Sequence, residues 1–259
     1  MGKIITIVNQ KGGVGKTTTA INLAASLALA EKDILVIDTD PQGNSTSGLG
    51  ISRDGLNKSL YDVYAGRCDM NDALQTTVME HLSILPSTID LLGVEVELAV
   101  KEGREKILDS MMNSIRDRYR YIFIDCPPSL GLLTLNALVA ADSVIIPVQC
   151  EYYALEGLGL LTKTLRLVRS SFNPNLEIEG IILTMFDPRN NLSREVATEV
   201  KKHFGDKVYD TVIPRNVTLG EAPSHGIPIL LYDVRSKGAQ SYLSLAKEIL
   251  NENGIRQRT

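Results

Sequence analysis

The sequence of 259 residues contains no tryptophan, few aromatic residues, only three cysteines and no excess of positive charge. Cys68, Cys126 and Cys150 lie far apart and match no metal-ligand or Cys-x-x-Cys spacing, which argues against a disulfide framework. A net charge of −4 excludes a protein that is basic over its whole surface. No apolar run reaches the ~18 residues of a membrane span, and the amino terminus lacks a secretory pattern. We therefore expect a cytoplasmic protein with reduced thiols and no membrane partner.

The chain does contain a regular alternation of short apolar runs and amphipathic segments. Runs rich in β-branched residues predict strands at 4–8, 34–38, 82–86, 121–125, 143–148, 178–184 and 208–213. Helical spacing predicts helices at 17–30, 104–118, 132–141, 155–171, 194–204 and 242–251. This pattern predicts an α/β protein with a doubly wound, mostly parallel sheet flanked by helices, in a single domain over residues 1–259.

The stretch NQKGGVGKTT, residues 9–18, joins the first predicted strand to the first predicted helix. It nearly fits the phosphate-binding loop G-x-x-x-x-G-K-[ST], whose backbone N–H groups cradle phosphates at a helix N-terminus. In that motif Lys16 contacts the β and γ phosphates of ATP, and the Thr17 hydroxyl holds Mg²⁺. The first glycine of the motif is replaced by Gln10, and beside it stands an extra lysine, Lys11. A Rossmann site fits worse, because the third glycine of its pattern is missing.

Aspartates follow two other predicted strands, Asp38 and Asp40 in LVIDTDPQGN and Asp125 in YIFIDCPP. Phosphoryl transfer uses carboxylates to hold the metal, to order its water shell and to position an attacking water. Asp125, after four apolar residues, fits a Walker B position that binds Mg²⁺ through water. Asp40 is the candidate that positions the hydrolytic water, and Asp38 is a further candidate metal ligand. The alternative for each aspartate is a helix or turn cap.

Five segments give the chain a resemblance to the ParA/Soj-type chromosome and plasmid partitioning ATPases, a deviant Walker A group of P-loop NTPases. They are KGGVGKTT at 11–18, DTDPQGN at 38–44, DCPPSLGLLTLNAL at 125–138, PVQCEYYALEGL at 147–158 and VIPRNVTLGEAPSHGIPI at 212–229. The resemblance implies weak intrinsic ATP hydrolysis and homodimers that form around ATP and Mg²⁺. It also implies nonspecific binding to double-stranded DNA, association with the nucleoid when ATP is bound, and a ParB/Spo0J-type partner that stimulates hydrolysis.

The resemblance also assigns roles to single residues. Lys11 matches the signature lysine that reaches the partner's nucleotide, Gly12 the point where two loops press together, and Glu151 a residue that supports that lysine or the nucleotide across the interface. An ammonium group there would offset transition-state charge, as an arginine finger does in trans. Residues 214–216 match the adenine-contacting segment. The expected nucleotide contacts are Lys11, Gly12, Gly13, Val14, Gly15, Lys16, Thr17, Thr18, Glu151, Pro214, Arg215 and Asn216, with Lys11, Lys16 and Asp40 as the catalytic groups.

Candidate DNA contacts lie in the last third of the chain and are all basic: Arg189, Arg194, Lys201, Lys202 and Arg215. Nonspecific binding requires only that several such cations face phosphates together. The alternative for each is a solvated surface charge. Many relatives have an arginine where this sequence has Thr218, so we expect a DNA surface that is thinner or shifted toward Arg189.

The same loop serves other functions. The main alternative is a MinD-like, membrane-cycling positioning ATPase, which needs a basic amphipathic helix near its C-terminus, whereas ENGIRQRT is short and polar. Iron–sulfur relatives need cysteines that share a cluster across a dimer, and Cys126 has no second cysteine at matching spacing. A P-loop kinase or ligase is a more distant alternative.

The second lysine of the loop generates the first prediction. We expect Lys11→Ala to change ATP affinity by less than about threefold but to abolish ATP-dependent dimers and lower hydrolysis by roughly 100-fold or more, because its charge acts on the partner's nucleotide. Nucleotide titration, light scattering and phosphate release measure the three quantities. Lys16→Ala is the matched control and is expected to lose ATP binding itself. Equal loss of ATP affinity in both variants would contradict the separate roles.

Overall fold

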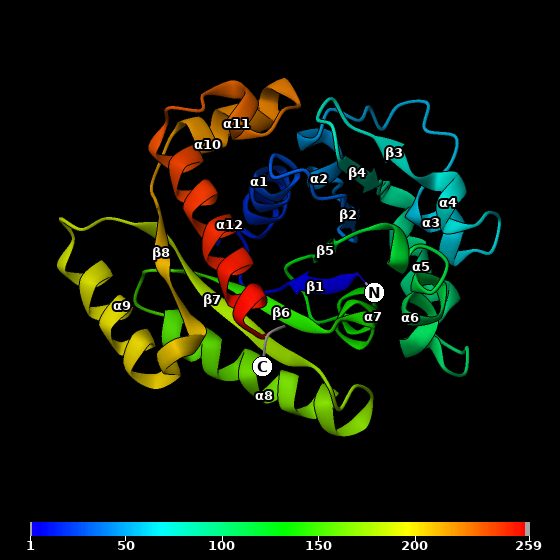
Figure 1. Ribbon diagram of the computed structural model, residues 1–259. Coiled ribbons are helices and arrows are strands. Elements are labelled where there is room, and N and C mark those ends of the chain that lie inside the picture. The colour runs from blue at the N-terminus through cyan, green and yellow to red at the C-terminus, as the bar shows by residue number, and fades with distance from the viewer. Residues whose placement is uncertain (1, 257–259) are drawn as a thin grey trace.

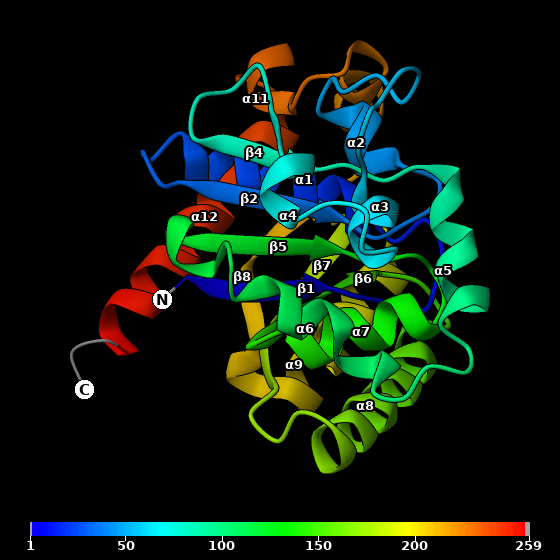
Figure 2. The same ribbon diagram turned by 90° about the vertical axis from the view of Figure 1, so that its right-hand side faces the viewer.

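The computed structural model describes residues 2–256 (Figure 1). Its centre is an eight-stranded sheet in the order β3-β4-β2-β5-β1-β6-β7-β8, in which only the β3–β4 pair is antiparallel. In this order β4, β2 and β5 lie side by side (Figure 2). The strands are β1 (Lys3–Ile7), β2 (Ile34–Asp38), β3 (Gln75–Thr76), β4 (Leu82–Leu85), β5 (Tyr121–Asp125), β6 (Ser143–Gln149), β7 (Glu177–Phe186) and β8 (Val208–Pro214).

All seven predicted strands are confirmed, and the predicted fold class is correct. The additional strand, β3, has only two residues and pairs with β4 at the edge of the sheet. Such a short segment carries no alternation of apolar and polar residues, so the sequence pattern did not reveal it.

Helices cover both faces of the sheet, which curves around α1 (Lys16–Ala28) and α12 (Lys237–Arg256) in Figure 1. On the opposite face lie α7 (Leu132–Ala140), α8 (Ala154–Ser171) and α9 (Asn191–Phe204). Smaller helices complete the layers: α2 (Asn44–Gly48), α3 (Leu60–Tyr64), α4 (Met70–Ala73), α5 (Leu92–Glu97), α6 (Ile107–Met112), α10 (Thr218–Glu221) and α11 (Ile229–Tyr232).

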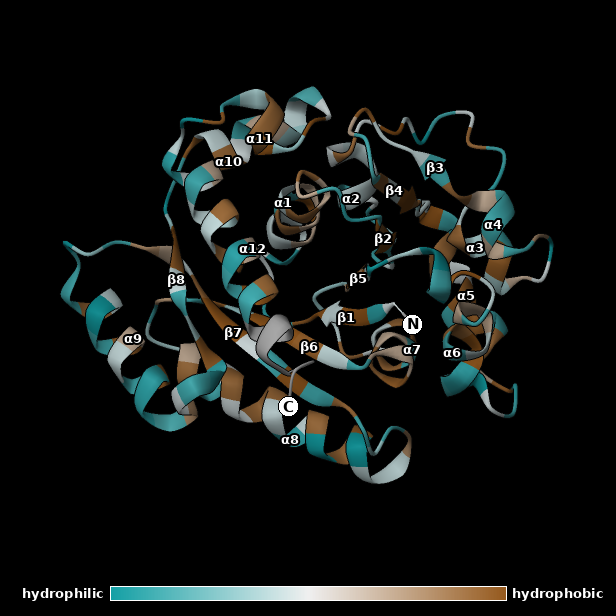
Figure 3. Ribbon diagram, in the orientation of Figure 1, coloured by the Kyte–Doolittle hydropathy of each residue, from teal (hydrophilic) through white to brown (hydrophobic). Residues whose placement is uncertain are grey.

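The central strands are buried on both faces, and Figure 3 shows hydrophobic residues along them. In β1, Ile4 packs in the core beneath α7 and α8, whereas Ile5 and Ile7 pack in the core beneath α1 and α12. This arrangement explains why the strands are continuous apolar runs instead of alternating ones. Across residues 2–256, none of the helices combines the length and hydrophobicity that a membrane crossing requires.

Two predicted helices have different bounds in the structure. The segment 104–118 is not one helix: α6 is preceded and followed by 3₁₀ turns at Arg104–Lys106 and Arg116–Arg118. Asn136 of α7 explains the first break, because its side chain accepts a hydrogen bond from Leu108 N and donates one to Arg104 O. These contacts come from a distant part of the chain, so helical spacing could not indicate them.

The last helix is longer than the predicted 242–251, and most of the segment ENGIRQRT continues it to Arg256. The hydroxyl of Ser236 accepts a hydrogen bond from Ala239 N at 3.2 Å, as an N-cap does, and this signal was missed. The end of that segment, residues 257–259, lies outside the described residues. The apolar face of α12, formed by Ala239, Tyr242, Leu245, Ala246 and Ile249, is buried against the rest of the domain.

The parallel strands bring the important loops to one edge of the sheet. β1 lies between β5 and β6, so the loop at 9–15 is flanked by the segments that follow these two strands. β2 pairs with β5 in a register that places Asp38 directly beside Asp125. Ligands of such sheets bind at this carboxyl edge, where adjacent strands lead to opposite faces.

Gly2 provides a test of how tightly the entry to β1 is held. A Cβ at this position would overlap the carbonyl oxygens of Tyr119 and Arg116. We therefore expect Gly2→Ala to lower the free energy of unfolding by about 1–3 kcal/mol, as overpacked sites do. Gly159→Ala in α8 is the control, since nothing lies within 4 Å of its added Cβ and alanine favours helix. Urea denaturation measures both, and an unchanged Gly2→Ala variant would mean that this backbone is not confined.

Candidate functional site

The loop between β1 and α1 has the form of a phosphate cradle. Gly13 and Gly15 have φ angles of 73° and 91°, a left-handed conformation that glycine adopts without strain. Thr184 Oγ1 donates to the Val14 carbonyl at 2.8 Å, and Asn9 Nδ2 donates to the Pro147 carbonyl at 2.8 Å, so neighbouring strands fix the loop. No side chain caps the first turn of α1, which leaves its N–H groups for an anion.

Lys16 lies inside this cradle. Its side chain is buried, and Nζ donates to the Lys11 carbonyl at 3.0 Å. Burial lowers the pKa of Lys16, and the nearby charges of Asp125 and Asp40 partly oppose this effect. Three predicted site residues, Lys16, Asp40 and Asp125, therefore lie close together. A phosphate bound here would stabilise the charged form of Lys16, which burial disfavours.

Asp125 fits a magnesium-binding role. Its carboxyl group is fully buried; Oδ2 accepts from Ser45 Oγ at 2.8 Å, and Oδ1 has no hydrogen-bond partner among residues 2–256. Burial raises the pKa of Asp125 to about 6, while the hydrogen bond from Ser45 opposes this rise. An unsatisfied buried oxygen beside Thr17 suits a cation or its bound water. No group of three acidic, histidine or cysteine ligands occurs within the described residues, so a magnesium ion there would also need phosphate oxygens and water.

The Asp38 carboxyl group is also fully buried, but both of its oxygens accept hydrogen bonds from the protein. Its Oδ1 accepts from Asp40 N, and its Oδ2 accepts from both the amide and the hydroxyl of Thr46. Burial and the charge of Asp125 raise the pKa of Asp38 to about 7. Its assignment as a metal ligand stays a prediction, but protein donors already engage both oxygens.

Asp40 lies in the turn between β2 and α2, close to Lys16. Its side chain is buried, and Oδ1 accepts from Gln42 N at 2.9 Å. The Asp40 carbonyl also accepts from Gly43 N at 2.9 Å. These bonds form a compact turn that holds Asp40 close enough to Lys16 for their charges to interact, and its water-positioning role stays a prediction.

Lys11 and Glu151 form an ion pair within the same chain. Their side chains are 40% and 34% exposed, so this lysine faces outward while Lys16 faces inward. Next to this pair, Gln10 Nε2 donates to the Gly157 carbonyl of α8 at 3.2 Å. The structure therefore brings Lys11 and Glu151 together within one protomer, and their expected contacts across a dimer stay a prediction.

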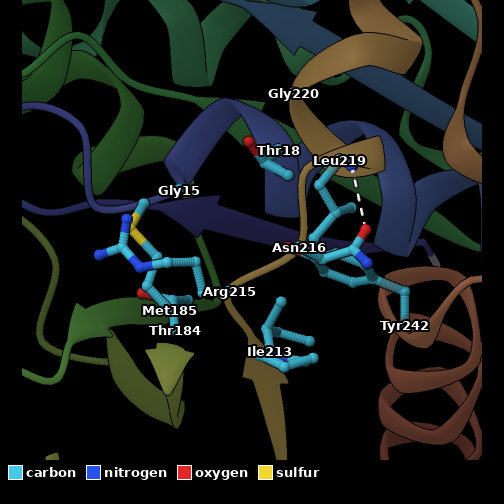
Figure 4. A pocket seen from close by; sticks show the side chains of 11 residues that line it. Gly15, Thr18, Thr184, Met185, Ile213, Arg215, Asn216, Leu219, Gly220 and Tyr242 are labelled. Atoms are coloured by element: carbon cyan, nitrogen blue, oxygen red, sulfur yellow. Dashed lines mark hydrogen bonds between the residues drawn. The ribbon is translucent and has the colours of Figure 1, made fainter. Parts of the chain in front are cut away.

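A cavity of about 220 Å³ opens beside the loop (Figure 4). The predicted adenine segment forms part of its wall, and Gly15 and Thr18 form another part. Leu219 N donates to Asn216 Oδ1 at 3.2 Å, which orders that segment. Further lining residues were not predicted, because they come from the end of β7, from β8, from α10 and from α12: Thr184, Met185, Ile213, Leu219, Gly220 and Tyr242.

The candidate DNA contacts separate into two places. Arg215 lines the cavity, whereas the other four lie on or before α9. Acidic groups pair with three of those: Arg189 with Asp187 at 3.0 Å, Lys201 with Asp210 at 3.1 Å, and Lys202 with Glu199 at 3.3 Å. Carboxylates therefore offset much of the positive charge on and before α9, and the expected DNA surface stays a prediction.

Comparison with known proteins decides the family. A family model described as an AAA domain matches residues 2–178. The sporulation initiation inhibitor protein Soj of Bacillus subtilis (strain 168) is 58% identical over 249 residues, which cover 96% of this chain and 98% of Soj. The chromosome-partitioning ATPase Soj of Treponema pallidum (strain Nichols) is 54% identical, over 99% of this chain and 100% of that protein. The chain belongs to the ParA/Soj family.

The same architecture occurs in a crystal structure of cobyrinic acid a,c-diamide synthase from Mycobacterium smegmatis with a bound ATP analogue and magnesium. Its TM-score is 0.85 at 36% identity, over 96% of this chain and 95% of the synthase. The fold predicted for this ParA/Soj-type protein is therefore one that also supports other reactions, so function has to be argued from its own site.

The raised pKa of Asp38 in this ParA/Soj-type protein leads to a prediction of how the free energy of unfolding depends on pH. Because the folded state raises the Asp38 pKa to about 7, it binds more protons than the unfolded state below that pH, and acidification stabilises it. We expect wild type to gain about 1–2 kcal/mol of unfolding free energy relative to Asp38→Asn between pH 7.5 and pH 5.5. Urea denaturation without nucleotide or Mg²⁺ measures the difference, and a relative loss on acidification would contradict the raised pKa.

Proposed function

We propose that this protein is an ATP-dependent DNA-segregation ATPase that converts ATP and water to ADP and phosphate with Mg²⁺ as cofactor. ATP and Mg²⁺ favour a sandwich homodimer, the dimer binds double-stranded DNA without sequence preference, and a ParB/Spo0J-type partner stimulates hydrolysis. The observation that carries the proposal is the contrast between the buried, inward-facing Lys16 and the half-exposed Lys11 on the outside of the same loop.

The triphosphate lies in the loop of residues 12–18, with its charge facing the N-terminus of α1 and the ammonium of Lys16. The Thr17 hydroxyl, and Asp125 through water, would hold Mg²⁺, and an ion there would supply positive charge that offsets the charge of the phosphates. The Asp40 carboxylate orients the attacking water. The cavity beside the loop takes the base against residues 213–216 and 219.

Lys11 couples hydrolysis to dimerisation. To reach a partner's nucleotide it has to leave Glu151, and an ion pair this exposed stabilises the protein by only about 0–1 kcal/mol. Triphosphate oxygens offer more negative charge than one carboxylate, so the exchange favours the dimer when ATP is present. Glu151 stays close enough to support the lysine in its new position.

DNA binding follows from doubling the cations near α9. A single protomer offers few of them, and most are paired with carboxylates, so affinity depends on two copies presenting Arg189, Arg194, Lys201 and Lys202 together. Such binding is weak, sensitive to salt and reversed when the dimer separates. Reversible binding of this kind places the ATP form on the nucleoid and returns the free form to the cytoplasm.

A cosedimentation experiment tests the DNA assignment against the membrane-cycling alternative. The variant Asp40→Ala, held in the ATP state, is expected to bind long DNA at low salt only with ATP, and not to bind anionic liposomes. Because the dimer carries two copies of Arg189, Arg189→Ala is expected to reduce the salt slope by about two units, one for each copy, whereas Lys101→Ala, at an exposed lysine elsewhere, is expected to leave the slope unchanged.

Binding to liposomes without binding to DNA would replace the partitioning proposal with the membrane-cycling one. Binding to DNA that does not depend on ATP would refute the switch.

A further inference from the structure

Asp38, at the end of β2, holds the turn that carries Asp40 at both of its ends. Its Oδ1 accepts from the amide of Asp40 at 3.1 Å, and its Oδ2 accepts from Thr46 N at 2.8 Å and from Thr46 Oγ1 at 2.7 Å. Asp38 and Thr46 are completely buried and Asp40 is 7% exposed. The Asp38 carboxylate therefore holds the start of the turn, at Asp40, and its end, at Thr46 of α2.

The Thr46 hydroxyl has a second partner. It accepts a hydrogen bond from Ser87 N at 2.9 Å, in the segment that follows β4. Its proton is used for Asp38 and a lone pair for Ser87, so a hydroxyl fits this position where an apolar group of the same shape does not. Between these contacts Gly43, at φ 63°, brings the turn against the same segment, since an added Cβ would lie 3.2 Å from the Ser87 carbonyl oxygen.

The preceding residue of α2 contacts the other carboxylate. Ser45 is also completely buried, and its hydroxyl donates to Asp125 Oδ2 at 2.8 Å. Ser45 and Thr46 of α2 are thus bonded to two adjacent carboxylates, which differ in how many of their oxygens accept a hydrogen bond. Within residues 2–256, Asp125 Oδ1 accepts none, whereas both oxygens of Asp38 accept at least one.

We propose that Asp38 and Thr46 are positioning residues that fix the Asp40 carboxylate for hydrolysis, and that Asp38 is not a ligand of Mg²⁺. The inference rests on the proposed ATPase function. A cation at Asp38 would compete with the donors from Asp40 and Thr46 for the same oxygens and weaken their hold on the turn, whereas at Asp125 it would meet an oxygen that accepts no hydrogen bond from residues 2–256. Asp38 therefore acts through the backbone of Asp40 and does not touch the nucleotide.

The test removes one hydroxyl at a time from α2. Thr46→Val is expected to lower kcat by roughly 10- to 100-fold, because small misplacements of a catalytic group cost that much, with KM for ATP and the half-saturating Mg²⁺ concentration within about threefold of wild type. Thr46→Ser, which keeps the hydroxyl, is expected to restore most of kcat. Thr164→Val, at a half-buried threonine of α8 whose hydroxyl bonds to Leu160 O within its own helix, is the control and is expected to leave the rate unchanged.

Ser45→Ala is the contrasting variant, since its hydroxyl contacts the magnesium-binding candidate. We expect it to raise the half-saturating Mg²⁺ concentration by about tenfold or more, with a smaller change in kcat at saturating metal. Labelled-phosphate release at varied ATP and Mg²⁺ gives all of these quantities. Thermal melts accompany each variant, and the Asp38→Asn variant repeats the test should Thr46→Val fail to fold.

Three results would overturn the inference: an unchanged kcat in Thr46→Val, a rate in that variant that excess Mg²⁺ restores, or failure of Thr46→Ser to recover activity. A wild-type protein that releases no phosphate from ATP would instead refute the proposed function itself. The two failures are therefore distinguishable.

Discussion

Two fully buried carboxylates, Asp38 and Asp125, stand side by side at the ends of adjacent parallel strands. Burial disfavours the charged form of both groups and is the main reason why the pKa of each is raised; the charge of Asp125 adds to this effect for Asp38, and the charge of Asp40 adds to it for Asp125. The surrounding chain compensates with hydroxyls from the start of α2 and with the ammonium of Lys16. The positions of α2 and of the turn at Asp40 depend on these hydrogen bonds.

The two lysines of the loop differ because their surroundings differ. Lys16 is buried at the start of α1 near the charges of Asp125 and Asp40, and burial destabilises its charged form until an anion binds. Lys11 is half-exposed and rests on Glu151, so solvent screens the pair and little free energy opposes its movement. In the proposed function, Lys16 is the permanent phosphate contact of the loop and Lys11 the movable one, which suits the proposed switch between monomer and dimer.

Much of the fold followed from local patterns. The seven long strands and helices α1, α7, α8 and α9 could be predicted because burial on two faces or on one face leaves a direct mark on the sequence. The broken segment around α6 could not, since Asn136 from α7 supplies the hydrogen bonds that interrupt it. Only some of the residues that line the cavity were predicted, for the same reason. Met185 comes from β7 and Tyr242 from α12, and these elements are far apart in the sequence.

The sequence by itself determined the fold class, the phosphate loop and the set of acidic residues at the strand ends, because each is encoded by a short contiguous motif. Only the tertiary structure decided which hydrogen-bond donors each of those acids has. Asp38 and Asp125 look alike in sequence, since each ends an apolar strand. In the structure, Thr46 and Asp40 donate hydrogen bonds to both oxygens of Asp38, whereas Asp125 Oδ1 accepts none from residues 2–256. That difference depends on where the chain returns after each strand, which no local pattern records.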